Sequence, residues 1–238
     1  MKLSRREAIR VSGTAVAGLS MGVSRPNDIV AQTVRQQEWP DHLVEGDLRQ
    51  RADLPLNPDG SAPEYPPEAA DEITGTIWRY TQGKPPEIEY DYRKMAIRLD
   101  SRGLARLGGT LRFSDLEGLP RRSYTTLLQC GAPQPTGIVK WTGVRFSDFA
   151  EMIEIQSPAH YCRVISHDGY WIDEDISTMM DPQVMLVWLM NDEAIPPING
   201  APLRLVIPFR YGARSIKAVS EITFGSPGLS MREPPSRG

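Results

Sequence analysis

The residues best suited to bind a charged ligand lie within residues 190–224. Arg210, Arg214 and Lys217 surround Gly212 there. Cations beside a glycine, which lets the backbone approach closely, can cradle an anion such as a phosphate. A solvated basic turn between two strands has the same composition, and such turns are common. The stretch alone leaves both interpretations open.

Cys130 is the residue that could bind a metal or act as a nucleophile. It follows the β-branched and apolar run 123–129 and precedes a loop rich in glycine and proline, so its side chain can face a cavity. A thiolate suits soft metals and metal–sulfur centres, although a lone cysteine is more often a small buried apolar residue. We interpret Cys162, in the middle of a predicted strand, as structural. The two cysteines could also form one disulfide in an oxidising compartment.

A cysteine hydrolase is a further possibility for Cys130, because nucleophilic catalysis needs only a nearby base. His160 or His167 could be that base if folding brings one of them close, and Asp168 could orient His167. Adjacent residues rarely adopt that geometry, so this is a minor alternative. The three histidines are too scattered for a histidine-built metal site.

Composition narrows the class of protein. The chain has 238 residues, of which 40% are hydrophobic and 24% charged, which is ordinary for a globular protein. A net charge of -3 gives no reason to expect nucleic-acid binding. Because the chain contains 21 prolines and 20 glycines, short strands and many loops are expected rather than long helices.

The amino-terminal residues 1–31 resemble an export signal. Ser4-Arg5-Arg6 matches the start of a twin-arginine signal. The apolar core at 11–23 is too short and too weak for a permanent membrane span. We therefore expect a periplasmic protein whose cofactor is inserted before export. Residues 32–73 are rich in proline and are predicted to form an extended segment that wraps the surface.

The remaining pattern predicts a mixed α+β domain, because short strands and helices follow one another without regular alternation. Strands or strand-like pieces are predicted at residues 74–80, 87–100 (a pair), 108–113, 123–129, 161–166 and 219–224. Helices are predicted to begin at Ser114, Ser147 and Asp181, the last of them running through Met190. Residues 74–225 then form one domain, and 226–238 form a polar tail.

Several short motifs occur in an order that resembles the molybdopterin-binding domain of the sulfite oxidase family. They are Cys130, Trp141-Thr142-Gly143-Val144, Asp168-Gly169-Tyr170, Asp181-Pro182 with the predicted helix to Met190-Asn191, Asn199-Gly200-Ala201-Pro202-Leu203-Arg204 and Tyr211-Gly212-Ala213-Arg214-Ser215-Ile216-Lys217. The resemblance covers residues 74–224. It implies a sulfite-oxidase-like α+β fold and a molybdenum–molybdopterin cofactor, with Cys130 as the protein ligand of the metal.

The resemblance also assigns roles to other residues. Tyr170 matches a tyrosine near the metal, and Arg79 matches a substrate-binding arginine. The positions that match the binding site of the pterin and its phosphate are Asn199, Arg204, Ser215, Ile216 and Lys217. The implied activity is oxygen-atom transfer on a small sulfur oxyanion or sulfoxide, with electrons exchanged with a separate haem or cytochrome partner.

Two departures from the family pattern affect the functional prediction. The sulfite-oxidising branch usually has histidine where this chain has Asn199, and the asparagine form is more similar to the bacterial catalytic subunits that reduce methionine sulfoxide. After Cys130 the expected asparagine and arginine are replaced by the loop 131–136. An accessory protein that binds the cofactor without turnover is therefore the alternative function.

Overall fold

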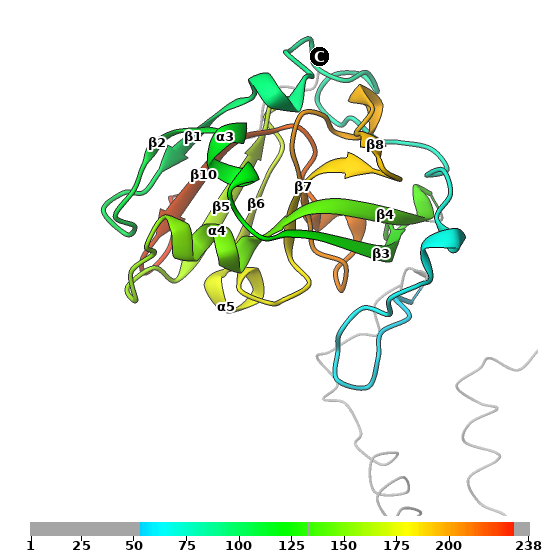
Figure 1. The fold of residues 1–238 in the computed structure, drawn as a ribbon, viewed down its shortest axis with the longest axis horizontal. Helices are drawn as coiled ribbons and strands as arrows, with labels where there is room; N and C mark the ends of the chain where they lie inside the picture. The colour runs from blue at the N-terminus through cyan, green and yellow to red at the C-terminus, as the bar shows by residue number, and fades with distance from the viewer. Residues whose placement is uncertain (1–52, 133, 231–238) are drawn as a thin grey trace, which may run out of the picture. The chain divides into compact units, whose positions relative to one another are not determined.

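The computed structural model describes residues 53–132 and 134–230 (Figure 1). The predicted export signal at 1–31, residues 32–52 and the end of the predicted tail at 231–238 lie outside the described residues. No helix in the described ranges is long and apolar enough to cross a membrane.

One sheet has the strand order β2-β1-β10-β5-β6. Strand β10 lies at its centre, parallel to β1 and antiparallel to β5, although β1 and β10 are far apart in the sequence. All other pairs in this sheet are antiparallel. The strands are β1 (Ala96–Asp100), β2 (Gly109–Arg112), β5 (Tyr161–Ser166), β6 (Trp171–Asp175) and β10 (Val219–Gly225).

The second sheet has the order β3-β4-β7-β8, and β9 also pairs with β7. Its long β3–β4 hairpin crosses the view in Figure 1. Gly143 of β4 lies so close to β7 that an added Cβ would be 2.0 Å from the Leu186 carbonyl oxygen. The strands are β3 (Arg121–Gln129), β4 (Thr136–Arg145), β7 (Met185–Met190), β8 (Glu193–Ala194) and β9 (Arg204–Val206).

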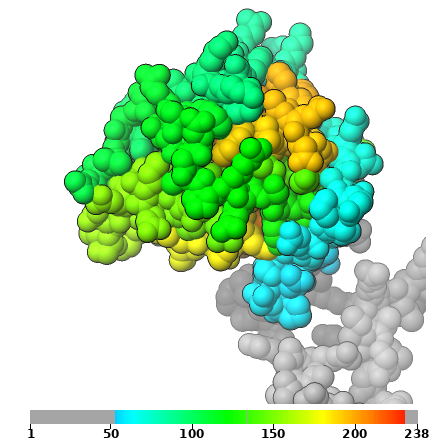
Figure 2. All heavy atoms as spheres, in the orientation of Figure 1, coloured from blue at the N-terminus to red at the C-terminus, as the bar shows by residue number. Residues whose placement is uncertain are grey.

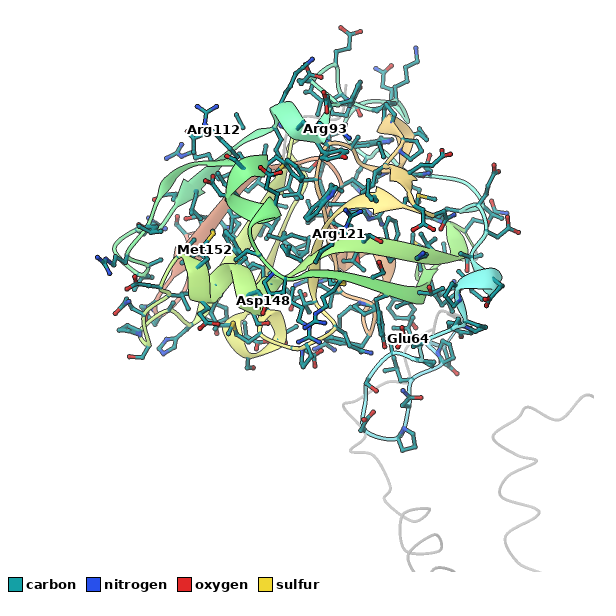
Figure 3. The ribbon with its side chains drawn as sticks, viewed as in Figure 1. Glu64, Arg93, Arg112, Arg121, Asp148 and Met152 are labelled. Atoms are coloured by element: carbon teal, nitrogen blue, oxygen red, sulfur yellow. The ribbon has the colours of Figure 1, made fainter. Side chains whose placement is uncertain are left out.

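The helices are short and lie between the strands. They are α3 (Phe113–Glu117), α4 (Phe146–Met152) and α5 (Ile176–Met179), with the 3-10 turns η2 (Pro67–Ala69), η3 (Tyr92–Lys94), η4 (Pro197–Asn199) and η5 (Gly212–Arg214). Figure 3 shows Asp148 and Met152 on α4, and Arg121 where β3 begins. Phe146 and Phe149 of α4 are fully buried in the main apolar core.

Residues 53–74, named here the strap, run in an extended path along β3 and β4. Tyr65 N donates to Thr125 O, Asp71 N to Ile138 O and Thr74 N to Thr136 O, each at 2.9 Å. Nearer the middle of the strap, the side chain of Gln183 bonds both backbone groups of Ala62 at 2.8 Å. Figure 2 shows the strap in cyan against the green surface of the hairpin. The strap leads directly into the residues that line the candidate site.

The main error in the predicted elements concerns 181–190. This stretch was expected to be a helix, but Met185–Met190 forms β7, and every one of its residues is buried. A strand buried on both faces is a continuous apolar run, and such a run does not differ from a buried helix by periodicity. Pro182, which favoured a helix start, lies in the turn before the strand.

Smaller differences occur at other elements. Only Ala96–Asp100 of the predicted pair at 87–100 is a strand, and 74–80 contributes a single bridge, between Thr74 and Thr136. Helices α3 and α4 begin one residue before the predicted caps, so Ser114 and Ser147 lie inside them. The carboxylate of Asp115 caps α3 by accepting from Arg112 N at 2.7 Å. Both cysteines are free thiols, so the disulfide alternative is wrong for this structure.

Candidate functional site

One cavity gathers the predicted site residues from distant parts of the chain. Of the residues predicted to act, those that line it are Arg79, Cys130, Tyr170, Asn199, Arg204, Ser215 and Lys217. Ile216 is the exception, because its side chain is fully buried in the main core and its carbonyl accepts from Leu205 N at 2.9 Å. Ile216 therefore anchors the two neighbours that do reach the cavity.

Cys130 forms what we name the thiol end of the cavity. It follows the last residue of β3 and is partly exposed. Its backbone N donates to Pro135 O at 3.0 Å, which closes the loop that follows. Cys162, by contrast, is fully buried on β5, and burial raises the pKa of its thiol. Of the two thiols, Cys130 is the one placed to react or to bind a metal.

Arg204 is a buried cation that also lines the cavity. It lies on β9 with 4% of its surface exposed, and its guanidinium carbon is 4.9 Å from the centroid of the Trp141 ring. One terminal nitrogen donates to Asn199 O at 2.8 Å, but Nε has no hydrogen-bond partner. Burial lowers the pKa of Arg204 to about 10. A buried cation with an unused donor is costly unless an anion binds there.

Lys217 adds a second cation to the same region. Its Nζ lies 4.0 Å from the centroid of the Trp78 ring and donates to Ile77 O. Burial, and then repulsion from Arg204, lower the pKa of Lys217 to about 7, while Asp168 acts in the opposite direction. Among the salt bridges formed by the described residues, none involves Arg204 or Lys217. Two cations without a paired carboxylate favour a bound anion.

The turn Asn199–Gly200 completes this region. Gly200 has φ of 111°, and an added Cβ would be 2.8 Å from Lys217 Cβ, so only glycine fits without strain. The Oδ1 atom of Asn199 is buried without a hydrogen-bond partner. We name Asn199, Arg204 and Lys217 the anion end. Its unpaired donor, Arg204 Nε, and its unpaired acceptor, Asn199 Oδ1, are suited to a ligand that carries both a phosphate and polar ring atoms.

The 3-10 turn η5 contributes Gly212 and Ala213 to the lining of the cavity. Arg214 fixes it to β6, because its Nε donates to the Glu174 carboxylate at 2.5 Å and a terminal nitrogen donates to Asp173 O. Ser215 follows the turn and accepts from Ile207 N at 3.0 Å through Oγ. An ion pair and a buried hydroxyl therefore hold the basic stretch in place.

An aromatic–cation group lies at the side of the cavity. Tyr170 donates its hydroxyl to Ala213 O at 3.0 Å, and the guanidinium carbon of Arg79 lies 5.5 Å from its ring centroid. Tyr80 lies 6.2 Å from Tyr170 between ring centroids. Burial raises the pKa of Tyr170, although Arg79 and Arg214 oppose the shift. Tyr170 therefore stays protonated at neutral pH and remains a hydrogen-bond donor.

The cavity also contains residues that sequence reasoning did not assign to it. Asp168 lines it and accepts from Tyr170 N at 3.0 Å, and the end of the strap contributes Ile73. The sequence placed Asp168 in the motif Asp168-Gly169-Tyr170 and as a possible partner of His167, without a role in the cofactor site. Neither His160 nor His167 lines the cavity, so the structure does not support a cysteine hydrolase.

The residues present fit a molybdopterin cofactor in their donor chemistry. A soft thiol and unpaired cationic and amide groups line the same cavity. These two kinds of group suit a molecule that carries both a metal and a phosphate.

The curated relatives of this chain include a sulfite oxidase and subunits of methionine sulfoxide reductases. Human mitochondrial sulfite oxidase is 26% identical over 87% of this chain and 43% of its own length. The methionine sulfoxide reductase catalytic subunit MsrP of Campylobacter jejuni is 29% identical over 59% of this chain and 53% of its own length. A putative reductase subunit, YedZ1, of Azospira oryzae is 26% identical over 53% and 48%. The chain thus spans about half the length of these relatives.

A solved structure supports the fold. The sulfane dehydrogenase SoxCD of Paracoccus pantotrophus matches with a TM-score of 0.53 and 19% identity, covering 89% of this chain and 55% of that one. The mixed α+β fold expected from the sequence is confirmed. The family model of the oxidoreductase molybdopterin binding domain matches residues 83–227, more than half of the chain. This protein therefore belongs to the sulfite oxidase family of oxidoreductases, whose domain binds molybdopterin.

Proposed function

We propose that this protein is an exported molybdenum oxidoreductase that transfers an oxygen atom from a sulfoxide or to a small sulfur oxyanion. The observation that carries the proposal is the joint placement of Cys130, Arg204 and Lys217 around one cavity. When bound, the molybdenum cofactor supplies two-electron oxygen-atom transfer. Sulfoxide reduction consumes two electrons and two protons and yields a sulfide and water. Relatives named methionine sulfoxide reductase favour this direction.

Each end of the cavity has its own role in the proposal. The Cys130 thiolate ligates the metal, because a soft ligand at a partly exposed position is suited to it. Arg204 and Lys217 bind the phosphate by charge-assisted hydrogen bonds. Asn199 and Ser215 contact the pterin, and Ile216 contributes through its backbone because its side chain is buried in the core.

Arg79 and Tyr170 act on the substrate. Arg79 is exposed and lies beside the Tyr170 ring, so its guanidinium can bind the oxygen of a sulfoxide or the oxygens of a sulfur oxyanion. Tyr170 can orient the same oxygen with its hydroxyl, which its raised pKa keeps protonated. Exchanging its bond to Ala213 O for one to the substrate requires only rotation of a hydroxyl.

Export and the redox partner complete the proposal. The basic start Ser4-Arg5-Arg6 supports the twin-arginine route. Electrons are exchanged with a separate haem or cytochrome partner. The description of the relatives as catalytic subunits agrees with a partner that supplies electrons.

Metal and pterin analysis tests the cofactor assignment. Protein purified from a molybdenum-sufficient host should contain molybdenum and pterin in equal amounts, and Cys130→Ser should lose most of the molybdenum. Cys162→Ser is the matched control and should retain it, since Cys162 is buried in the core and does not line the cavity. Folded wild-type protein without molybdenum, or full occupancy in Cys130→Ser, contradicts the proposal.

Turnover assays separate an enzyme from an accessory protein. The changed loop after Cys130 favours the accessory alternative. Loaded protein should reduce sulfoxides with a reduced dye, or oxidise sulfite with an oxidised dye. Arg79→Ala should raise the KM with less effect on kcat, because uniform binding is lost. Bound cofactor with no turnover in either direction would assign the accessory role instead.

A further inference from the structure

Gln129 is a buried amide directly before Cys130, at the last position of β3. It has 9% of its surface exposed. Its Nε2 donates to Cys130 O at 2.8 Å and to Ala132 O at 3.3 Å. Its Oε1 accepts from the Thr136 hydroxyl at 2.8 Å. One side chain therefore bonds both the start of the loop and the strand that follows the loop.

Thr136 links this arrangement to the strap. It pairs with Gln129 in the β3–β4 register and begins β4. Its carbonyl accepts from both the backbone N and the hydroxyl of Thr74 at 2.9 Å. Because Cys130 N is bonded to Pro135 O, both backbone groups of Cys130 are occupied. Cys130 is thus held by one backbone bond to Pro135 and by the side chain of Gln129, because the β3–β4 ladder ends at Gln129.

We propose that Gln129 is a positioning residue that holds the Cys130 thiol toward the cavity, in the orientation that the metal requires. This rests on the proposed role of Cys130 as metal ligand. An amide is needed because it donates to two carbonyls and accepts from a hydroxyl at the same time. A carboxylate cannot donate to the carbonyls, and an apolar side chain leaves them unpaired.

Thiol labelling of cofactor-free protein tests the inference without any activity measurement. Cys162 is fully buried, so reaction with iodoacetamide under native conditions reports on Cys130. Gln129→Leu should raise the labelling rate about tenfold at one fixed pH, since the loop then opens more readily. Thr136→Val, which removes one donor, should raise it about threefold. Thr136→Ser retains the hydroxyl and should restore the wild-type rate.

Gln183→Leu is the matched control. Gln183 is also a partly buried glutamine, and it bonds Ala62 and Tyr124 instead of the Cys130 loop. A general loss of stability would raise the labelling rate in both glutamine variants. The inference is overturned if Gln129→Leu labels no more than about twofold faster than Gln183→Leu. If Gln129→Leu does not fold, the comparison of Thr136→Val with Thr136→Ser decides in the same way.

Molybdenum content distinguishes this inference from the proposed function. When both variants are purified with their cofactor, Gln129→Leu should contain about tenfold less molybdenum than Gln183→Leu. A wild-type protein without molybdenum contradicts the proposed function, while the labelling rates still decide whether Gln129 positions Cys130. A loaded wild type with equal molybdenum in both variants contradicts the positioning role alone.

Discussion

The two ends of the cavity are built by different means. The anion end is set into secondary structure, since Arg204 lies on β9 and is paired with β7, and Gly200 packs against Lys217. The thiol end is a loop whose shape depends on side-chain hydrogen bonds from Gln129. Backbone pairing within a core resists local opening, whereas a loop opens at lower cost.

This difference assigns different tasks to the two ends. The anion end carries uncompensated charge in a rigid frame, so it is preorganised for a phosphate at the expense of stability. The thiol end instead depends on a few bonds that hold its loop. A change at the anion end should therefore affect anion binding, whereas a change at the thiol end should affect the position of Cys130.

The largest expected effect is a backbone change at the anion end. Gly200→Ala should lower the free energy of unfolding by about 3 kcal/mol, because φ is 111° and the new Cβ meets Lys217. Urea unfolding measures the change. Gly118→Ala is the control, since φ is -76° and no atom lies within 4 Å of the added Cβ. Equal stability in the two variants would mean that the turn is not rigid.

Arg204→Met should weaken anion binding and at the same time stabilise the folded protein. Sulfate, used as a non-titrating substitute for the phosphate, should bind to cofactor-free protein about 30-fold more weakly, since a charge-assisted contact is lost. The free energy of unfolding should rise by about 1 kcal/mol, because an unpaired buried cation is removed. Calorimetry and urea unfolding measure the two quantities. The control Arg210→Met changes an exposed arginine of the same stretch, and it should alter neither the sulfate affinity nor the free energy of unfolding. A lower free energy of unfolding in Arg204→Met contradicts the interpretation.

A smaller effect is expected from pH. Lys217 has a pKa of about 7 in the free protein, and a bound anion raises it. Below pH 7 the lysine is already protonated and sulfate affinity should be constant. Above pH 7 binding must take up a proton, so affinity should fall by up to about tenfold per pH unit. The profile should be flat in Lys217→Arg, whose guanidinium stays charged.

Nearby groups do not account for such a profile. Burial lowers the pKa of His167, so this residue is neutral above pH 7. A sulfate profile that stays flat in the wild type up to pH 9 would show that Lys217 is not part of the anion end.

The sequence predicted most of the strands but not the whole architecture. Runs such as 123–129 and 161–166 have apolar and β-branched residues over strand lengths, and they are strands in the structure. Residues 181–190 were misassigned because burial on both faces removes the alternation that identifies a strand. The pairing of β1 with β10 depends on tertiary contacts that no local pattern reports.

The parts of the site that lie in sequence motifs could be predicted. Cys130 and the run from Asn199 to Lys217 were identified by residue type and order, and the fold places both around one cavity. The role inferred for Gln129 was not predictable, because a glutamine in a strand has no distinctive pattern until its bonding partners are known. Asp168 was recognised as part of a motif, but its place in the cavity depends on β5, β6 and the strap packing together.

The central place of β10 has a consequence for how the protein is made. Without β10, the first sheet is two separate pairs, β2–β1 and β5–β6. A chain growing on the ribosome therefore cannot close this sheet until Val219–Gly225 has been synthesised and released. Pairing of β1 with β10 joins residues more than a hundred positions apart, for example Arg98 with Glu221, which slows folding. Removing this last strand should leave aggregation-prone fragments of sheet rather than a smaller working domain.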